Sequence, residues 1–363
     1  SKSTRAKRQF KTVILFFIVF SSGISLYIIG DTVKSIMEKK WLRKNRFGFI
    51  LILMIKITIL LWLILLIGCT QSSGTDHEAA QATRYFANAD FSFAVYGETA
   101  QAQKIHKKII PQIAFQKPDI IVHSGNLVEN PASESHWEAF FRILTPVSGV
   151  ISRYYIVPGK LETEHPEEIR HRFAHLSVFM KEKTYYSFIF KNALFIILNP
   201  HLKQDELFRQ QWFIIDIMKK FVLRSNGPVF VFSHKPIYST GPSGVEQFLL
   251  RNWLILLEHF RATLLFSGQD KLYGRYKTSS STSTVCLVSR LTSEEGDRCN
   301  QPTNEFEQFY CRKGSSYLLV GIRNNTVGVK AFDDEGRVID SFEVSVPSRY
   351  HTRAGIEGVY ERF

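Results

Sequence analysis

Val229-Phe-Val-Phe-Ser-His234-Lys-Pro-Ile-Tyr238 is an apolar run that stops abruptly at a histidine, a lysine and a proline. A run of Val and Phe without polar alternation predicts a strand that is buried on both faces. Pro236 ends the strand because proline has no N–H to donate to a neighbouring strand. His234 is therefore expected at the carboxyl end of a strand, where open α/β sheets bind their ligands.

Three other segments have the same form, an apolar run followed by glycine and polar residues, at 91–99, 119–128 and 264–271. The carboxyl ends of parallel strands meet at one edge of a sheet. We therefore expect these ends and the His234 strand to converge on one pocket.

Further apolar runs predict strands at 154–157, 185–190 and 193–198. Helical spacing of apolar residues predicts helices between the strands, at 101–115, 137–144, 204–223 and 245–260. The order of elements predicts an α/β layered fold. On the helix at 204–223, one stripe of apolar residues is expected to face the core: Trp212, Ile215 and Met218.

The chain changes character after about residue 277. Residues 278–316 are rich in Ser and Thr and then polar without a clear period, so we expect a long loop. Three strand patterns with turn residues between them follow at 316–322, 326–332 and 338–346. They predict an antiparallel meander, after which residues 347–363 form a tail.

The formal charge of +13 is concentrated near the amino terminus. Residues 1–53 hold eleven Lys and Arg against two Asp and Glu, a net of +9, which leaves +4 for the other 310 residues. A nucleic-acid-binding surface needs basic residues gathered on the folded part of the chain. We therefore expect no nucleic-acid partner.

Two apolar segments, 12–30 and 47–68, are each close to the roughly 20 residues that cross a bilayer as a helix. Basic residues between them hold the intervening loop in the cytoplasm: Lys39, Lys40, Arg43, Lys44 and Arg46. We therefore expect residues 1–69 to be an anchor or signal region and 70–89 a tether. The body would then lie outside the cytoplasm, on the periplasmic or extracellular face of a membrane.

The second segment ends in Leu66-Ile67-Gly68-Cys69, which resembles the lipobox of bacterial lipoproteins and implies lipidation of Cys69. Lys56 would cost about 2.5–3.5 kcal/mol at the centre of a spanning helix. A start at Met54 removes this cost, because Met54 to Lys56 then forms a basic n-region before an apolar stretch. A lipoprotein, a single transmembrane anchor and a membrane hairpin are the alternatives that stay open.

Cys299 and Cys311 lie twelve residues apart in a polar region. An oxidising compartment would permit a disulfide between them, and two free thiols are the alternative. Cys286 lies in an apolar run and is predicted to be a small core residue.

The four strand ends resemble the motif set of the calcineurin-like metallophosphoesterases, including the purple acid phosphatase branch. The resemblance spans residues 90–346 and includes the run Val329 to Ile339. It implies an α/β fold, an αββα sandwich with C-terminal antiparallel strands. It also implies that strand-end loops hold two metal ions, Fe, Mn or Zn, which bind the substrate phosphate and activate a water.

The implied ligand positions are largely altered. Gly97-Glu98-Thr99-Ala100 stands for Gly-Asp-x-His, so that a carboxylate is kept and a histidine is lost. Gly125-Asn126 stands for the Gly-Asp whose carboxylate bridges both metals. His234 matches the family's metal-binding histidine. Glu98, Asn126 and His234 are therefore the remaining candidate metal ligands.

Two lysines occupy further ligand positions. Gly159-Lys160-Leu161-Glu162 stands for Gly-Asn-His-Glu, and Gly268-Gln269-Asp270-Lys271 stands for Gly-His-x-His. A charged ammonium repels a dication and offers it no lone pair. We therefore expect no metal cofactor.

One function that follows is a catalytically silent protein of the phosphoesterase fold, which binds a phosphate-containing ligand or a protein partner. Lys160 and Lys271 would supply positive charge to an anion, and Asn126 and Gln269 would donate hydrogen bonds. Both lysines pointing to solvent is the alternative. The other function is a metal-dependent phosphoesterase with a divergent site, built on Glu98, His234 and displaced residues.

Overall fold

The computed structural model describes residues 84–278, 284–303 and 306–346. The apolar segments at 12–30 and 47–68, Cys69 and the tail at 347–363 lie outside these ranges. Within the described ranges, no helix is both long and apolar enough to cross a membrane.

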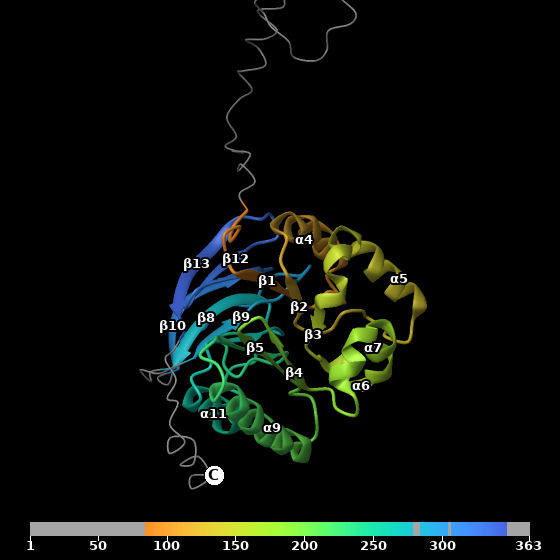
Figure 1. The fold of residues 1–363 in the computed structure, drawn as a ribbon. Helices are drawn as coiled ribbons and strands as arrows, with labels where there is room; N and C mark the ends of the chain where they lie inside the picture. The colour runs from red at the N-terminus through yellow and green to blue at the C-terminus, as the bar shows by residue number, and fades with distance from the viewer. Residues whose placement is uncertain (1–83, 279–283, 304–305, 347–363) are drawn as a thin grey trace, which may run out of the picture. The chain divides into compact units, whose positions relative to one another are not determined.

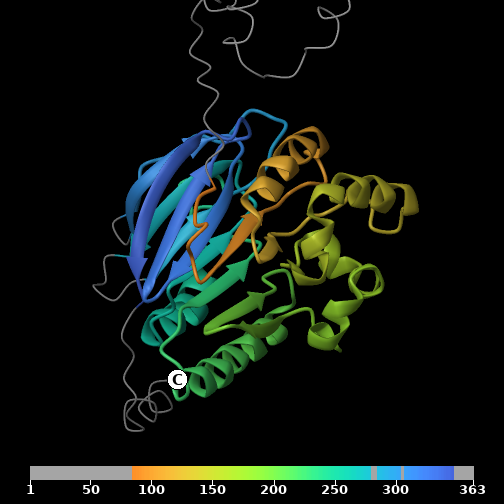
Figure 2. The same cartoon turned by 45° about the horizontal axis from the view of Figure 1, so that its top comes forward.

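Two mixed β-sheets form the centre of the fold, and helices lie on their outer sides (Figure 1; Figure 2). The first has the order β13-β12-β11-β1-β2-β3 and the second β10-β8-β9-β7-β6-β5-β4. The first sheet comprises β1 (Phe91–Tyr96), β2 (Ile120–His123), β3 (Tyr154–Ile156), β11 (Tyr317–Arg323), β12 (Thr326–Phe332) and β13 (Val338–Ser345). The second comprises β4 (Tyr186–Phe190), β5 (Ala193–Leu198), β6 (Val229–Ser233), β7 (Leu264–Ser267), β8 (Leu272–Thr278), β9 (Val285–Val288) and β10 (Phe306–Lys313).

The α-helices are α4 (Gln103–Gln116), α5 (Glu134–Ile143), α6 (Lys160–Glu164), α7 (Pro166–Arg172), α8 (Ser177–Met180), α9 (Gln204–Val222), α10 (Gln247–Leu249) and α11 (Ile255–His259). The helix predicted at 245–260 is divided, because Leu250–Leu254 form a π-helical segment between α10 and α11. Short 3₁₀ segments occupy Thr145–Arg153 and Ala174–Leu176.

Aromatic side chains fill the space between the two sheets. Phe93 of β1 lies 5.3 Å from Phe195, 4.9 Å from Phe230 and 5.8 Å from Phe266, measured between ring centroids. All four side chains are at most 1% exposed. These contacts explain why the strands are continuously apolar: each is covered by the other sheet on one face and by helices on the other.

The prediction of a single long loop over 278–316 was wrong. β9 and β10 lie in this region, and β8 ends at its first residue. β10 is an edge strand that pairs only with β8 in its sheet, and its exposed and partly buried residues include Glu307, Gln308 and Arg312. β10 forms because it pairs with β8, and not because its residues form an apolar run. Its sequence therefore shows little strand pattern.

The loop between β9 and β10 is bound to the second sheet. Cys299 and Cys311 form a disulfide, with their Cα atoms 6.1 Å apart. Cys286 is a buried free thiol of β9. The disulfide fastens the loop to an edge strand, which also holds it through the ion pair of Lys313 with Glu295.

The predicted core stripe of α9 is correct at two positions and wrong at the third. Ile215 and Met218 are buried, whereas Trp212 is 57% exposed. The helix turns its buried side, with Ile214, Met218 and Phe221, toward the second sheet. Trp212 lies six residues from Met218 and so falls on the other side of the helix.

The strand register places the loop residues at one edge of the sandwich. In the first sheet Tyr96, His123 and Ile156 are neighbours across β1, β2 and β3. In the second sheet Leu198, Ser233, Ser267 and Val288 are neighbours across β5, β6, β7 and β9. All these strands are parallel, so the residues that follow each of them emerge together.

Candidate functional site

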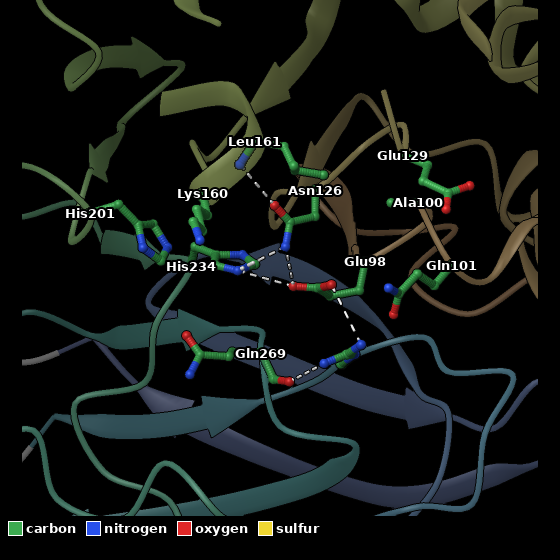
Figure 3. A pocket seen from close by; sticks show the side chains of 11 residues that line it. Glu98, Ala100, Gln101, Asn126, Glu129, Lys160, Leu161, His201, His234 and Gln269 are labelled. Carbon is green, nitrogen blue, oxygen red and sulfur yellow. Dashed lines mark hydrogen bonds and ion pairs between the residues drawn. The ribbon is translucent and has the colours of Figure 1, made fainter. Parts of the chain in front are cut away.

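The loops that follow these aligned strand ends enclose a pocket of about 380 Å³. Figure 3 shows its side chains, which come from both sheets. The lining residues are Glu98, Ala100, Gln101, Asn126, Glu129, Lys160, Leu161, His201, His234, Gln269 and Arg290. The predicted convergence of the strand ends is therefore present in the structure, and it brings together five of the six residues predicted for the pocket.

Three of the pocket residues have left-handed backbone conformations. Glu98, Asn126 and Gln269 have φ values of 64°, 53° and 70°, and each follows a glycine. A non-glycine residue in this conformation costs free energy and persists only where the surroundings impose it. The three loops thus keep a strained geometry that turns each side chain toward the pocket.

A hydrogen-bonded ion pair occupies the centre of the pocket (Figure 3). His234 Nε2 lies 3.0 Å from Glu98 Oε1, and His234 Nδ1 lies 2.7 Å from the backbone oxygen of Ser124. Both ring nitrogens therefore face acceptors, an arrangement that requires the doubly protonated imidazolium. The two side chains are almost completely buried.

The charges of the pair support each other. Burial lowers the pKa of His234, but the carboxylate of Glu98 and the carbonyl of Ser124 more than offset this, so that its pKa is raised. Burial raises the pKa of Glu98, but His234, Arg290 and Asn126 together lower it below its usual range. Both shifts therefore favour the pair of an imidazolium and a carboxylate.

Two neighbours complete this network. Asn126 Nδ2 donates to Glu98 Oε1 at 3.1 Å, while Asn126 Oδ1 accepts from the Leu161 N–H at 3.3 Å. Asn126 Nδ2 also lies 3.4 Å from His234 Nε2, but two donors meet there when His234 is protonated, so we assign no hydrogen bond. Arg290 places a guanidinium nitrogen 3.6 Å from Glu98 Oε2 and donates to the Gln269 backbone oxygen.

These residues do not fit a pair of metal ions. The nitrogen of His234 that faces the pocket is bonded to Glu98, and the other oxygen of Glu98 faces Arg290. The amide oxygen of Asn126 is turned to a backbone N–H. Throughout the described ranges, no three His, Cys, Asp or Glu side chains are grouped so that they could hold a metal ion.

The two lysines predicted for the pocket have different surroundings. Lys160 begins α6 and lines the pocket as an exposed side chain, with no carboxylate of the described ranges within ion-pair distance. Lys271 forms an ion pair with Glu294 and does not line the pocket. The basic side chain that lies beside Glu98 is Arg290.

Glu162, the last residue of the Gly159 motif, points away from the pocket. Its carboxylate accepts hydrogen bonds from the backbone N–H groups of Asn126, Leu127 and Gly159, at 2.8, 2.8 and 2.9 Å. Burial raises its pKa, although these three donors act in the opposite direction. Glu162 therefore fixes the two loops that carry Asn126 and Lys160.

Sequence reasoning missed four polar residues of the pocket, Gln101, Glu129, His201 and Arg290. Arg290 follows β9, which lies in the segment predicted to be a loop. His201 follows β5, and its ring centroid is 5.1 Å from that of His234. Burial, with the nearby His234, lowers the pKa of His201 to about 3, so this imidazole is neutral. His201 could have been found from the sequence, because the predicted strand at 193–198 also ends at this edge of the sheet.

No protein-family model matches the sequence, and no curated protein matches it. The fold does match solved structures. GAP50, the anchor in the inner membrane complex of Plasmodium, has a TM-score of 0.58 and 13% identity, over 75% of this chain and 94% of that chain. Purple acid phosphatase PPD1 from yellow lupin (Lupinus luteus) seeds has a TM-score of 0.55 and 14% identity, over 74% of this chain and 55% of that chain.

Identity this low establishes the fold and nothing finer. The chain has the fold of the calcineurin-like phosphoesterases, as the resemblance of its strand ends predicted.

Proposed function

We propose that this chain is a membrane-anchored, catalytically silent protein of the phosphoesterase fold, which acts by binding a ligand or partner. One observation carries the proposal: the Glu98–His234 ion pair, flanked by Arg290 and Asn126, occupies the pocket in which members of this fold bind metals. The positive charges of His234 and Arg290 then stand in the pocket in place of the charge of metal ions. An imidazolium cannot ligate a metal until it loses a proton.

Metal content and turnover of the full-length chain test this proposal. We expect no stoichiometric Mn, Fe or Zn in the purified protein and no hydrolysis of an aryl phosphate with or without added metal. Stoichiometric metal with turnover that disappears in His234→Ala would instead establish the second function, a metal-dependent phosphoesterase with a divergent site. An active purple acid phosphatase in the same assay controls for the substrate.

A small phosphate-type anion is the ligand that the pocket suits best. Lys160 supplies a cation that no carboxylate of residues 84–278, 284–303 or 306–346 pairs with, and Gln269 lines the same pocket. Glu129 also lines it and opposes anion binding, so we expect only weak affinity, with Kd on the order of 1 mM.

Calorimetric titration with inorganic phosphate tests the anion proposal. We expect Lys160→Ala to abolish binding and Lys271→Ala, whose ammonium is paired with Glu294, to leave it unchanged. Absence of binding to the wild type, or equal effects of the two substitutions, would contradict the proposal and favour a protein partner.

Anchoring is supported by the apolar segments at 12–30 and 47–68, and the location outside the cytoplasm by the basic loop between them. The Cys299–Cys311 disulfide also fits an oxidising compartment. Mass spectrometry of the native amino terminus distinguishes the forms of anchor. A diacylated Cys69 would identify a lipoprotein, and peptides from residues 1–53 in the mature protein would contradict a start at Met54.

A further inference from the structure

α9 carries a row of exposed apolar side chains on the side away from the core. Phe208, Trp212 and Leu223 remain 44%, 57% and 54% exposed. Because they are four and eleven residues apart, close to whole turns, they lie in one row about 22 Å long. We call these three residues the α9 crest.

The crest is part of a firmly packed element. Trp137 and Trp253 are fully buried, so Trp212 is exceptional among the tryptophans of the described ranges. Gln211 Nε2 donates to Asn252 Oδ1 at 2.8 Å and ties α9 to the next helical segment. α9 and α11 lie close together at the same end of the molecule (Figure 1). The exposed row is therefore held in a fixed position.

The charge around the crest favours an anionic surface. Residues 203–224 hold five Lys and Arg and three Asp and Glu, a net of +2. Glu206 pairs with Arg209 at 2.7 Å and Asp216 with Lys220 at 2.6 Å, and these pairs leave the net of +2 unchanged. Exposed Trp and Leu flanked by basic residues are typical of helices that lie in a membrane interface.

The chain outside the described ranges limits how far the domain could move from a membrane. Fifteen residues connect Cys69 to Arg84, and such a segment spans at most about 50 Å when fully extended. A domain held this close meets the bilayer surface continually, so that even weak attraction is effective.

We propose that the α9 crest is a membrane-docking surface, which inserts Trp212 and its apolar neighbours into the headgroup region of an anionic bilayer. The proposal rests on the anchoring proposed above. Docking would fix the orientation of the domain and thereby the direction in which the pocket opens.

Quenching of Trp212 by bilayers tests the proposal. The full-length chain is reconstituted into vesicles that contain phosphatidylserine, with or without bromine on the acyl chains. Subtracting the emission of Trp212→Phe from that of the wild type isolates Trp212, because any quenching of the other tryptophans is common to both. We expect brominated lipid to reduce this difference signal at least about twofold, and the quenching to weaken in neutral vesicles.

A double variant and a matched control separate docking from unfolding. Phe208→Gln with Leu223→Gln retains Trp212, and we expect it to lose most of the quenching. Val178→Gln changes a side chain that is 67% exposed elsewhere, and it should leave the quenching unchanged.

The outcomes separate the two proposals. A chain that alkaline carbonate washes off the vesicles would contradict the anchor and, with it, the docking surface. A chain that stays in the vesicles while its Trp212 signal is unaffected by bromine would overturn the docking surface alone. Shielding of Trp212 without bromine quenching would also overturn it, because a protein would then cover the crest.

Discussion

Glu98, Asn126 and Gln269 keep left-handed backbones although their side chains differ from the metal ligands that the resemblance implies. Each such residue costs roughly 1–3 kcal/mol. The surrounding sandwich imposes these conformations, so the pocket keeps its shape while its chemistry changes. The glycine that precedes each of the three residues restricts the shape of its loop as strongly as the side chains do.

Among these three glycines, Gly125 is the one with a left-handed backbone. Its φ is +104°, and a Cβ there would lie 2.6 Å from His234 Nδ1 and 2.8 Å from the backbone nitrogen of Gly159. We expect Gly125→Ala to lower the free energy of unfolding by about 3 kcal/mol or more, measured by urea denaturation. Gly149→Ala is the control, because a Cβ there meets nothing within 4 Å, and it should change stability by less than about 0.5 kcal/mol. Equal effects would contradict the prediction.

His106 should make the fold sensitive to mild acid. It is buried beside Tyr96 and Phe140, and burial lowers its pKa to about 3. Below pH 6.5 the unfolded chain binds a proton at this residue that the folded chain does not, so stability falls as the pH falls. We expect His106 to contribute about 2 kcal/mol to the loss between pH 7 and pH 5.

Urea unfolding of the wild type and of His106→Phe at both pH values measures this contribution. The variant should lose less stability on acidification, while His165→Phe, at an exposed position, should behave as the wild type. A pH dependence that is the same in His106→Phe and the wild type would show that His106 is not the source.

The loops at the strand ends are fixed by one another. Glu162 on the short helix α6 bonds three N–H groups of two loops and so links the ends of β2 and β3. A helix of five residues has little stability of its own. The position of Lys160 in the pocket therefore depends on this buried carboxylate.

Glu162→Ala tests this link between elements. Three buried N–H groups would lose their acceptor, and we expect a loss of about 3–5 kcal/mol in the free energy of unfolding. Glu164→Ala, an exposed position two residues away, should cost less than about 0.5 kcal/mol. Hydrogen exchange should show faster exchange at Asn126 and Leu127 in the first variant only. Unchanged protection there would contradict the role of Glu162.

The two sheets are also joined away from the pocket. Asp340 of β13, in the first sheet, accepts from the Tyr273 hydroxyl and from Arg275 Nε of β8, in the second, both at 2.8 Å. The Arg275 guanidinium also lies 4.4 Å from the Phe342 ring centroid. These contacts close the side of the sandwich at which edge strands β10 and β13 lie (Figure 2).

Asp340→Ala should therefore weaken the whole domain. The buried Tyr273 hydroxyl and the partly buried guanidinium would lose their acceptor, and we expect about 3 kcal/mol of destabilisation in thermal or urea unfolding. Ser341→Ala, at the next and exposed residue of the same strand, is the control. A similar loss in both variants would show that β13 is sensitive to any substitution.

Much of the fold could be predicted from local pattern. Continuous apolar runs identified β1, β2, β5, β6 and β7, because a strand covered on both faces must be apolar throughout. β8 and β10 were missed, since the edge strand and its neighbour gain stability from pairing across the sheet, and the short apolar run of β9 lies in the segment predicted to be a loop. Trp212 was misplaced because its spacing of six residues from Met218 puts it on another side of the helix from the buried residues.

The sequence by itself determined that His234 lies at a strand end, that four such ends converge, and that lysine, glutamine and asparagine stand at implied ligand positions. Only the tertiary structure decided what the pocket holds instead. Arg290 follows β9, which lies in the segment predicted to be a loop, and Lys271 turns to Glu294. The charge of His234 depends on acceptors 136 and 110 residues away in the chain, Glu98 and Ser124. Protonation follows from distances in space, and residue types alone do not specify those distances.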